Sequence, residues 1–123
     1  MEDNCIKFDP RLDVEFLQSI YEDDKEHALI VFSEFLKMAP TQMKEIEQNY
    51  CSGTVELFRQ KIHKIKPVFS FVGLTELTAK AEILEKRCKE ISHLVELNEL
   101  YTEFKSYYRK TYPIIENEAI RLT

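Results

Sequence analysis

The chain has 123 residues, of which 44% are hydrophobic and 32% are charged, and its formal net charge is −5. This is the size and balance of one compact domain, so we expect residues 1–123 to form a single domain. An acidic chain is a poor candidate for binding nucleic acid, because that binding rests on a large basic surface that neutralises several phosphates.

The sequence indicates neither secretion nor membrane insertion. Its first ten residues, MEDNCIKFDP, lack the basic and then apolar layout of a secretory signal. The longest aliphatic and aromatic run, residues 28–32, is far shorter than the roughly 18 residues of a membrane span. Cys5, Cys51 and Cys88 are widely spaced and form no metal-binding pair, which is typical of reduced thiols. We therefore expect a soluble, cytoplasmic protein that does not contact a membrane.

Helices are predicted nearly throughout, because the chain has only two glycines and no alternating strand pattern. A short helix over residues 12–21 comes first. The second helix starts after Asp24, a suitable N-cap residue, and we expect Pro40 to bend it without ending it. Its apolar side chains recur at intervals of three and four residues: Leu29, Phe32, Leu36, Ala39, Met43, Ile46 and Tyr50.

Three further helices follow. The third is capped by Ser52 or Thr54, stops at Gly73 and directs five side chains inward: Phe58, Ile62, Ile65, Phe69 and Val72. Thr75 caps the fourth, whose inward residues are Leu77, Ala81, Leu84, Cys88 and Ile91. The fifth starts after Ser92 and is bent or ended by Pro113. Its apolar residues are Leu97, Leu100, Phe104 and Tyr107 or Tyr108.

Short connections between long amphipathic helices favour antiparallel neighbours. The sequence therefore predicts an all-α fold, an antiparallel up-down-up-down four-helix bundle with an additional short N-terminal helix. No second apolar stripe is evident on these helices, so we expect a monomer.

The stretch FRQKIHKIKPVFSFVGL, residues 58–74, surrounds one histidine with four cations and contains no acid. At about 100° per residue, His63 falls roughly 140° from the centre of the apolar face, so its ring should lie in solvent. Arg59 and Lys66 are its neighbours on the helix surface. The remaining residues around the ring are polar or small: Gln60, Lys64, Pro67 and Ser70.

An exposed histidine is usually only part of a solvated face, and we interpret His27 and His93 in that way. His63 differs from them because a cationic surface surrounds it. A neutral imidazole is a competent nucleophile toward an activated phosphoryl group, and nearby cations stabilise that group once it is attached. The sequence contains no nucleophile motif of a hydrolase and no zinc-binding H-E-x-x-H.

The stretch HKIKPVFSFVGL resembles the motif of the histidine phosphotransfer (HPt) domains of multistep phosphorelays. That motif is a histidine, a lysine three positions later, a small residue next and a glycine ten positions after the histidine. His63, Lys66 and Gly73 occupy these places, followed by Leu74, and Pro67 is the one departure. The stretches FLKMAPTQMKEIEQ and LTAKAEILEKRCKE resemble the helices before and after the motif, so the resemblance covers about residues 16–91.

The resemblance implies that His63 accepts a phosphoryl group from an aspartate of one receiver domain and passes it to another. It also implies that Lys66 contacts the phosphoryl oxygens. The partners would be response regulator receiver domains and a hybrid histidine kinase, and the receiver would supply the Mg²⁺. We expect no cofactor of the chain's own and no kinase activity, because the sequence has no glycine-rich nucleotide loop.

We expect the receiver to dock around the motif, with Phe71 as an exposed apolar contact close to Pro67 on the outer face. The alternative for Phe71 is that the N-terminal helix covers it. The expected partner-binding residues are Arg59, Gln60, Lys64, Pro67, Ser70 and Phe71. Two other classes stay open. One is a helical adaptor that binds a receiver or another signalling partner without being phosphorylated. The other is a metal-dependent bundle enzyme, which needs inward Glu and His ligands at three-residue spacing; the one E-x-x-H of the sequence, Glu90 to His93, lies at a predicted helix junction and not on an inward face.

Overall fold

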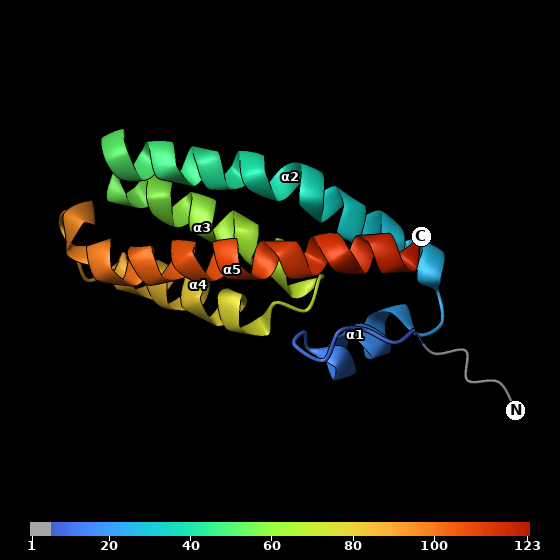
Figure 1. Cartoon of the computed structure of the whole chain (residues 1–123). Coiled ribbons are helices and arrows are strands. Elements are labelled where there is room, and N and C mark those ends of the chain that lie inside the picture. Colours follow the sequence, from blue (N-terminus) through green and yellow to red (C-terminus); the bar gives the residue numbers. More distant parts are fainter. Residues whose placement is uncertain (1–5) are drawn as a thin grey trace, which may run out of the picture.

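The computed structural model describes residues 6–123, and this part of the chain is helical without a strand, which confirms the predicted all-α class. Figure 1 shows the helices in chain order. They are α1 (Val14–Tyr21), α2 (Lys25–Ser52), α3 (Val55–Ser70), α4 (Thr75–Arg87), the short 3₁₀ helix η1 (Leu94–Leu97) and α5 (Asn98–Leu122).

The four long helices lie side by side, and α1 lies at one end of the group, near the C-terminal end of α5 (Figure 1). Helix α3 packs against α2 and α4, and α5 also packs against α2 and α4. Each long helix therefore has two long neighbours. The core between them is completely buried at Phe32, Ile62, Leu84 and Phe104, one residue from each helix.

The apolar stripes predict the inward faces closely. All five residues expected to point inward from the third helix are buried, and so are Leu77, Ala81, Leu84 and Cys88 of the fourth segment. In α2, three of the seven expected inward residues are buried (Phe32, Ala39 and Ile46) and the other four are half-buried, whereas Ala28 and Phe35, which were not expected, are also buried. Ile91 is only half-buried, since α4 ends at Arg87 and the chain turns before reaching it.

Helix starts are fixed by side-chain caps at three places. The Asp24 carboxylate accepts a hydrogen bond from the backbone N–H of His27 at 3.0 Å, and the Thr54 hydroxyl accepts one from Leu57 at 3.1 Å. Thr54 is thus the cap of α3, whereas Ser52 still belongs to α2. Asp13 caps α1, which starts at residue 14 and not at residue 12.

Thr75 does not cap α4, so that prediction is wrong. Leu74 occupies the N-cap position and makes no side-chain cap. The Thr75 hydroxyl instead donates to the Asp13 carboxylate at 2.8 Å, and the Asp13 N–H donates to the Gly73 carbonyl at 2.9 Å. The α3–α4 turn is therefore tied to the start of α1, a contact between distant parts of the chain that local spacing cannot reveal.

Gly73 is the C-terminal signal of α3, as predicted. The last residue of α3 is Ser70, the N–H groups of Gly73 and Leu74 donate to the carbonyls of Ser70 and Phe69 at 3.0 Å each, and Gly73 has a φ of +77° in the left-handed region. A Cβ atom there would also lie 2.7 Å from Leu17 of α1. Both features require glycine at this position.

Three of the long helices contain a proline. Helices α2, α3 and α5 continue through Pro40, Pro67 and Pro113, so Pro113 does not end the last helix. That helix starts only at Asn98, because the 3₁₀ helix η1 precedes it.

Cys51 is an exposed free thiol and Cys88 a buried one, whereas Cys5 lies outside the described residues. Over residues 6–123, none of the helices combines the length and the apolar composition that a bilayer span requires.

Candidate functional site

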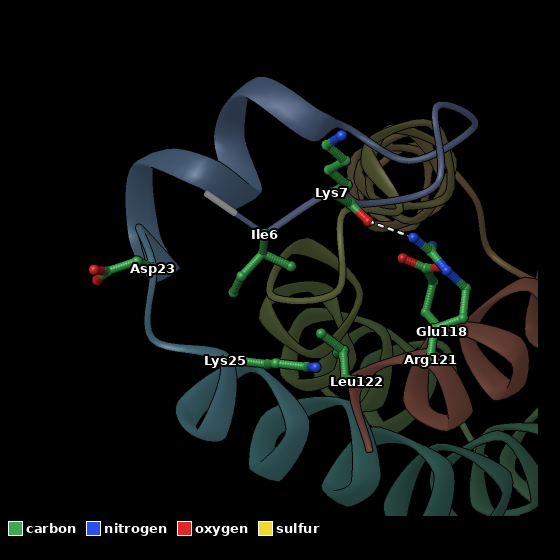
Figure 2. Close-up of a pocket in the computed structure, with 7 residues that line it drawn as sticks. All are labelled: Ile6, Lys7, Asp23, Lys25, Glu118, Arg121 and Leu122. Carbon is green, nitrogen blue, oxygen red and sulfur yellow. Dashed lines mark hydrogen bonds and ion pairs between the residues drawn. The ribbon is translucent and has the colours of Figure 1, made fainter. Parts of the chain in front are cut away.

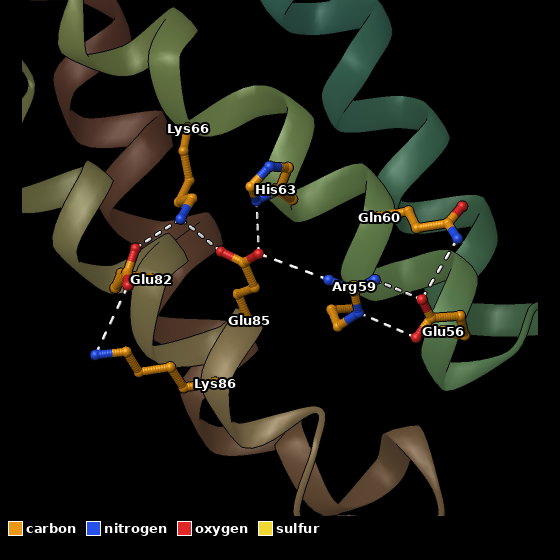
Figure 3. Close-up of polar contacts among 8 residues, drawn as sticks. All are labelled: Glu56, Arg59, Gln60, His63, Lys66, Glu82, Glu85 and Lys86. Atoms are coloured by element: carbon orange, nitrogen blue, oxygen red, sulfur yellow. Dashed lines mark hydrogen bonds and ion pairs between the residues drawn. The ribbon is translucent and has the colours of Figure 1, made fainter.

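His63 lies on the outer face of α3 and points toward solvent and α4 (Figure 3). Its side chain is 66% exposed, which confirms the orientation predicted from the helical spacing. The reason is the burial of Ile62 and Ile65, which fixes the rotation of α3 about its axis. The ring is therefore open to a partner on one side and held by α4 on the other.

Glu85 of α4 holds the ring. Its Oε2 lies 2.6 Å from Nδ1 of His63, and its side chain is only 13% exposed. Burial disfavours ionisation of Glu85, but hydrogen bonds from Lys66 and His63 outweigh it, so the pKa of Glu85 lies below its usual value. An ionised carboxylate only accepts hydrogen bonds, so Nδ1 is the nitrogen that donates. In the neutral ring, Nε2 then carries the free lone pair.

Lys66 lies one turn beyond His63 and makes two ion pairs with α4 (Figure 3). Its Nζ is 2.5 Å from Oε1 of Glu85 and 2.6 Å from Oε2 of Glu82. Hydrogen bonds to Glu82 and then to Glu85 raise the pKa of Lys66, so the amine stays protonated. The same Glu85 carboxylate thus binds the histidine through one oxygen and the lysine through the other.

Arg59 lies one turn before His63 and is also paired. It binds Glu56 of its own helix through Nε at 3.0 Å and Nη2 at 2.5 Å, and its Nη1 lies 3.7 Å from Glu85. Gln60 donates to the same Glu56 at 3.4 Å. The guanidinium is therefore held beside the site by two carboxylates.

These contacts change the cationic surface that the sequence predicts around His63. Three carboxylates, from Glu56, Glu82 and Glu85, neutralise much of the positive charge around the ring. Lys61 does not belong to the site, because its Nζ pairs with Glu45 of α2 at 3.4 Å. Lys64 is exposed and makes no ion pair within the described part of the chain.

Glu82 and Glu85 are the residues of this candidate site that sequence reasoning missed. A weak signal exists, because they are three residues apart on the fourth helix and flank the inward residue Leu84. That spacing predicts a shared face at the edge of the core. It does not predict which helix the two carboxylates meet.

The other predicted partner-binding residues spread around α3. Ser70 is half-buried, and its hydroxyl lies 3.3 Å from that of Thr78 on α4. Pro67 is exposed, and Phe71 is 49% exposed, as predicted. Phe71 turns toward α2, where it lines an apolar cavity of about 110 Å³ with Val31, Glu34, Phe35, Met38 and Val68.

A larger pocket of about 440 Å³ lies where the N-terminal segment meets the ends of α2 and α5 (Figure 2). Its lining contains none of the predicted site residues: Ile6, Lys7, Asp23, Lys25, Glu118, Arg121 and Leu122. Glu118 accepts the backbone N–H of Asp9 at 2.9 Å and pairs with Arg121, which donates to the carbonyl of Lys7 at 2.7 Å. These charged groups fasten the N-terminal segment to α5.

The other two histidines, His27 and His93, each contact a residue close to them in the sequence. The ring of His27 lies edge-on to Tyr21, with centroids 5.1 Å apart, and His93 forms a capping box with Glu96. Among residues 6–123, no group of three or more His, Cys, Asp or Glu side chains is placed to hold a metal ion.

No protein-family model, curated protein or solved structure matches this chain. The functional interpretation therefore rests on the residues and geometry around His63.

Proposed function

We propose that this chain is a phosphoryl carrier of the histidine phosphotransfer type, in which Nε2 of His63 takes a phosphoryl group from a receiver aspartate and passes it to another receiver. The observation that carries the proposal is the hydrogen bonding of the imidazole together with its exposure to solvent. Its Nδ1 is bound by Glu85 at 2.6 Å, whereas the His63 side chain is 66% exposed. The nitrogen with the free lone pair is thus the one that a partner can reach.

The transfer step needs no proton movement on this chain. The Nε2 lone pair forms a bond to phosphorus while the bond between phosphorus and the aspartyl oxygen breaks, and that oxygen leaves with the electron pair as carboxylate. The imidazole ring becomes cationic and keeps its proton on Nδ1. The ionised Glu85 stabilises this positive charge, in the way that a buried carboxylate stabilises an imidazolium in other histidine-dependent sites.

Lys66 supplies the counter-charge for the attached phosphoryl group. It sits one helical turn after His63, so its ammonium can reach the phosphoryl oxygens. Arg59, one turn before, adds a second cation on the same face. The receiver would supply Mg²⁺ and most of the catalytic groups, and this chain the nucleophile and its charged surroundings.

The docking surface we propose consists of Arg59, Gln60, Lys64, Pro67, Ser70 and Phe71. Lys64 contributes unshielded positive charge, and the exposed rings of Pro67 and Phe71 contribute apolar area. The acidic pocket of a receiver complements the cations. Since glutamates already neutralise Arg59 and Lys66, we expect added salt to weaken association less than it would for four unpaired lysines and arginines.

The fold that we propose for this carrier is an up-down-up-down four-helix bundle of α2, α3, α4 and α5, with α1 added at one end. The pairwise packing of these helices supports it. In such a bundle, an outer-face residue of α3 near its middle is accessible to a partner without any opening of the core.

The rival function is a helical adaptor that binds the same partner without phosphorylation. The double pairing of Lys66 favours it, because a lysine bound by two carboxylates contributes less positive charge to a phosphate site. An adaptor would keep its affinity for the receiver when His63 is replaced, and phosphoryl flow would not change.

The test is to mix the protein with a receiver carrying labelled aspartyl phosphate and to follow label into an acid-labile, alkali-stable adduct. We expect label in the wild type and none in His63→Gln. His27→Gln is the matched control, because His27 is also an exposed histidine on a long helix and should leave transfer unchanged. Label that persists in His63→Gln would remove His63 from the assigned role. Receiver binding without label in the wild type would favour the adaptor.

A further inference from the structure

The Lys66 ammonium is occupied before any phosphoryl group arrives. Two of its three N–H donors point at carboxylates, at 2.5 Å from Glu85 and 2.6 Å from Glu82. A phosphoryl group on Nε2 of His63 would have to compete for the same ammonium. We infer that Glu82 is a competing counter-ion that withholds Lys66 from the phosphoryl group and so shortens the lifetime of the phosphohistidine. This inference rests on the function proposed above.

The two glutamates are not equivalent. Glu85 is 13% exposed and also binds His63, so losing it would release the imidazole as well as the lysine. Glu82 is 44% exposed and makes no contact with His63 within the described residues. Its other partner is Lys86, whose Nζ lies 3.7 Å from Oε1 on the exposed surface of α4. Glu82 can therefore give up Lys66 and remain paired, whereas Glu85 cannot leave without disturbing the nucleophile.

The competition for Lys66 predicts the direction in which Glu82 changes the lifetime of the phosphohistidine. The phosphoryl dianion and the Glu82 carboxylate both attract the same cation, the ammonium of Lys66. When Glu82 holds Lys66, the dianion on His63 is less stabilised, which favours its departure to a receiver or to water. Removing the charge of Glu82 should therefore lengthen the lifetime of the phosphohistidine and raise the share of label held by this chain at equilibrium.

The first experiment compares Glu82→Gln with the wild type after labelling by a phosphorylated receiver. We expect the half-life of the phosphohistidine and the equilibrium ratio of carrier label to receiver label to rise about two- to fivefold, the range of a solvent-exposed ion pair. Glu45→Gln is the matched control. The side chain of Glu45 is 45% exposed and pairs with Lys61 of α3, which does not belong to the site, so this variant removes the same charge from a similarly exposed ion pair without freeing Lys66. An equal rise in both variants would overturn the inference.

The second experiment separates the action through Lys66 from a general loss of negative charge. In the Lys66→Ala background, Glu82→Gln should no longer change the half-life, because the cation for which Glu82 competes is gone. A persistent increase in the double variant would show that Glu82 acts on the phosphoryl group directly. That result would also overturn the inference.

A third measurement does not need phosphorylation. NMR titration of the Lys66 side chain should give a lower pKa in Glu82→Gln than in the wild type, and an unchanged pKa in Glu45→Gln, because hydrogen bonding to Glu82 is the main cause of the raised pKa of Lys66. An unchanged pKa in Glu82→Gln would mean that the pair does not form in solution. If the pKa falls as expected but the wild type takes no label on His63, the failure lies in the proposed function, and the inference fails with it.

Discussion

Nδ1 of His63 on α3 lies 2.6 Å from Oε2 of Glu85 on α4, across the interface between two neighbouring helices. This single contact decides which ring nitrogen is available for chemistry. It also connects His63 to Lys66, because the other oxygen of the same carboxylate lies 2.5 Å from the lysine Nζ. The geometry of the site is thus set by the packing of α3 on α4.

Replacing Glu85 should slow phosphoryl transfer to His63. Glu85→Gln keeps a hydrogen-bond acceptor but loses the charge that stabilises the cationic ring, and Glu85→Ala loses both. We expect a fall of about tenfold for Ala, the value of one charge-assisted hydrogen bond, and a smaller fall for Gln. The measurement is the transfer rate at saturating receiver, together with the ring ¹⁵N spectrum of His63. That spectrum should show one tautomer in the wild type and a mixture in Glu85→Ala; a mixture in the wild type would contradict the assigned contact.

Replacing Lys66 should affect the chemistry and not the fold. Lys66→Ala removes the cation beside the phosphoryl group, and we expect transfer to slow by about tenfold on the same charge-assisted basis. Lys61→Ala is the control, since it removes an equal charge from α3 but on the side that faces Glu45 of α2. The circular dichroism spectra of both variants should match that of the wild type. Equal transfer rates in the two variants would discard the phosphate contact.

The orientation of His63 could be predicted from sequence because it depends on local periodicity. Once Ile62 and Ile65 are buried, a histidine between them must face outward. The partners of that histidine could not be predicted. Glu85 is 22 residues away, and its arrival beside the ring depends on the relative rotation and offset of two helices. The same reason explains why the stretch around His63 looked strongly positive when read alone.

Some helix ends could also be predicted from the sequence, and others could not. The Asp24 and Thr54 caps follow from local side-chain chemistry and were predictable. Thr75 has the same cap-forming chemistry, yet its hydroxyl binds Asp13, which is 62 residues distant. A tertiary contact overrides the local preference there, and only the structure shows it.

Glu118 should be important for stability. Its carboxylate is 2% exposed, and it accepts from the Asp9 backbone and pairs with Arg121. Glu118→Ala would leave the part-buried N–H of Asp9 without its acceptor and Arg121 without its ion-pair partner, so we expect the free energy of unfolding to fall by about 1–3 kcal/mol. Urea denaturation measures it, with Glu116→Ala as an exposed control on the same helix. A loss no larger than that of the control would contradict the role of Glu118 in fastening the N-terminal segment.

Asp9 should contribute to loss of stability in acid. Side-chain and backbone hydrogen bonds from Arg11 lower the pKa of Asp9 from 3.8 to about 2. A lowered folded-state pKa means that the unfolded chain binds the proton more readily, so this contribution is present above pH 3.8 and is lost as the pH falls toward 2. The free energy of unfolding, measured across this range, should decline less steeply in Asp9→Asn than in the wild type. Parallel curves would show that the pair with Arg11 does not form in solution.

The most direct test of the phosphoryl carrier is to locate the phosphoryl group on the protein after reaction with a phosphorylated receiver. ³¹P and ¹⁵N NMR of the labelled protein distinguish the two ring nitrogens of a phosphohistidine and separate it from other phosphorylated side chains. We predict one phosphoryl group, on Nε2 of His63, with Nδ1 still protonated against Glu85. Phosphorus on Nδ1, on another residue or on none would contradict the proposed function.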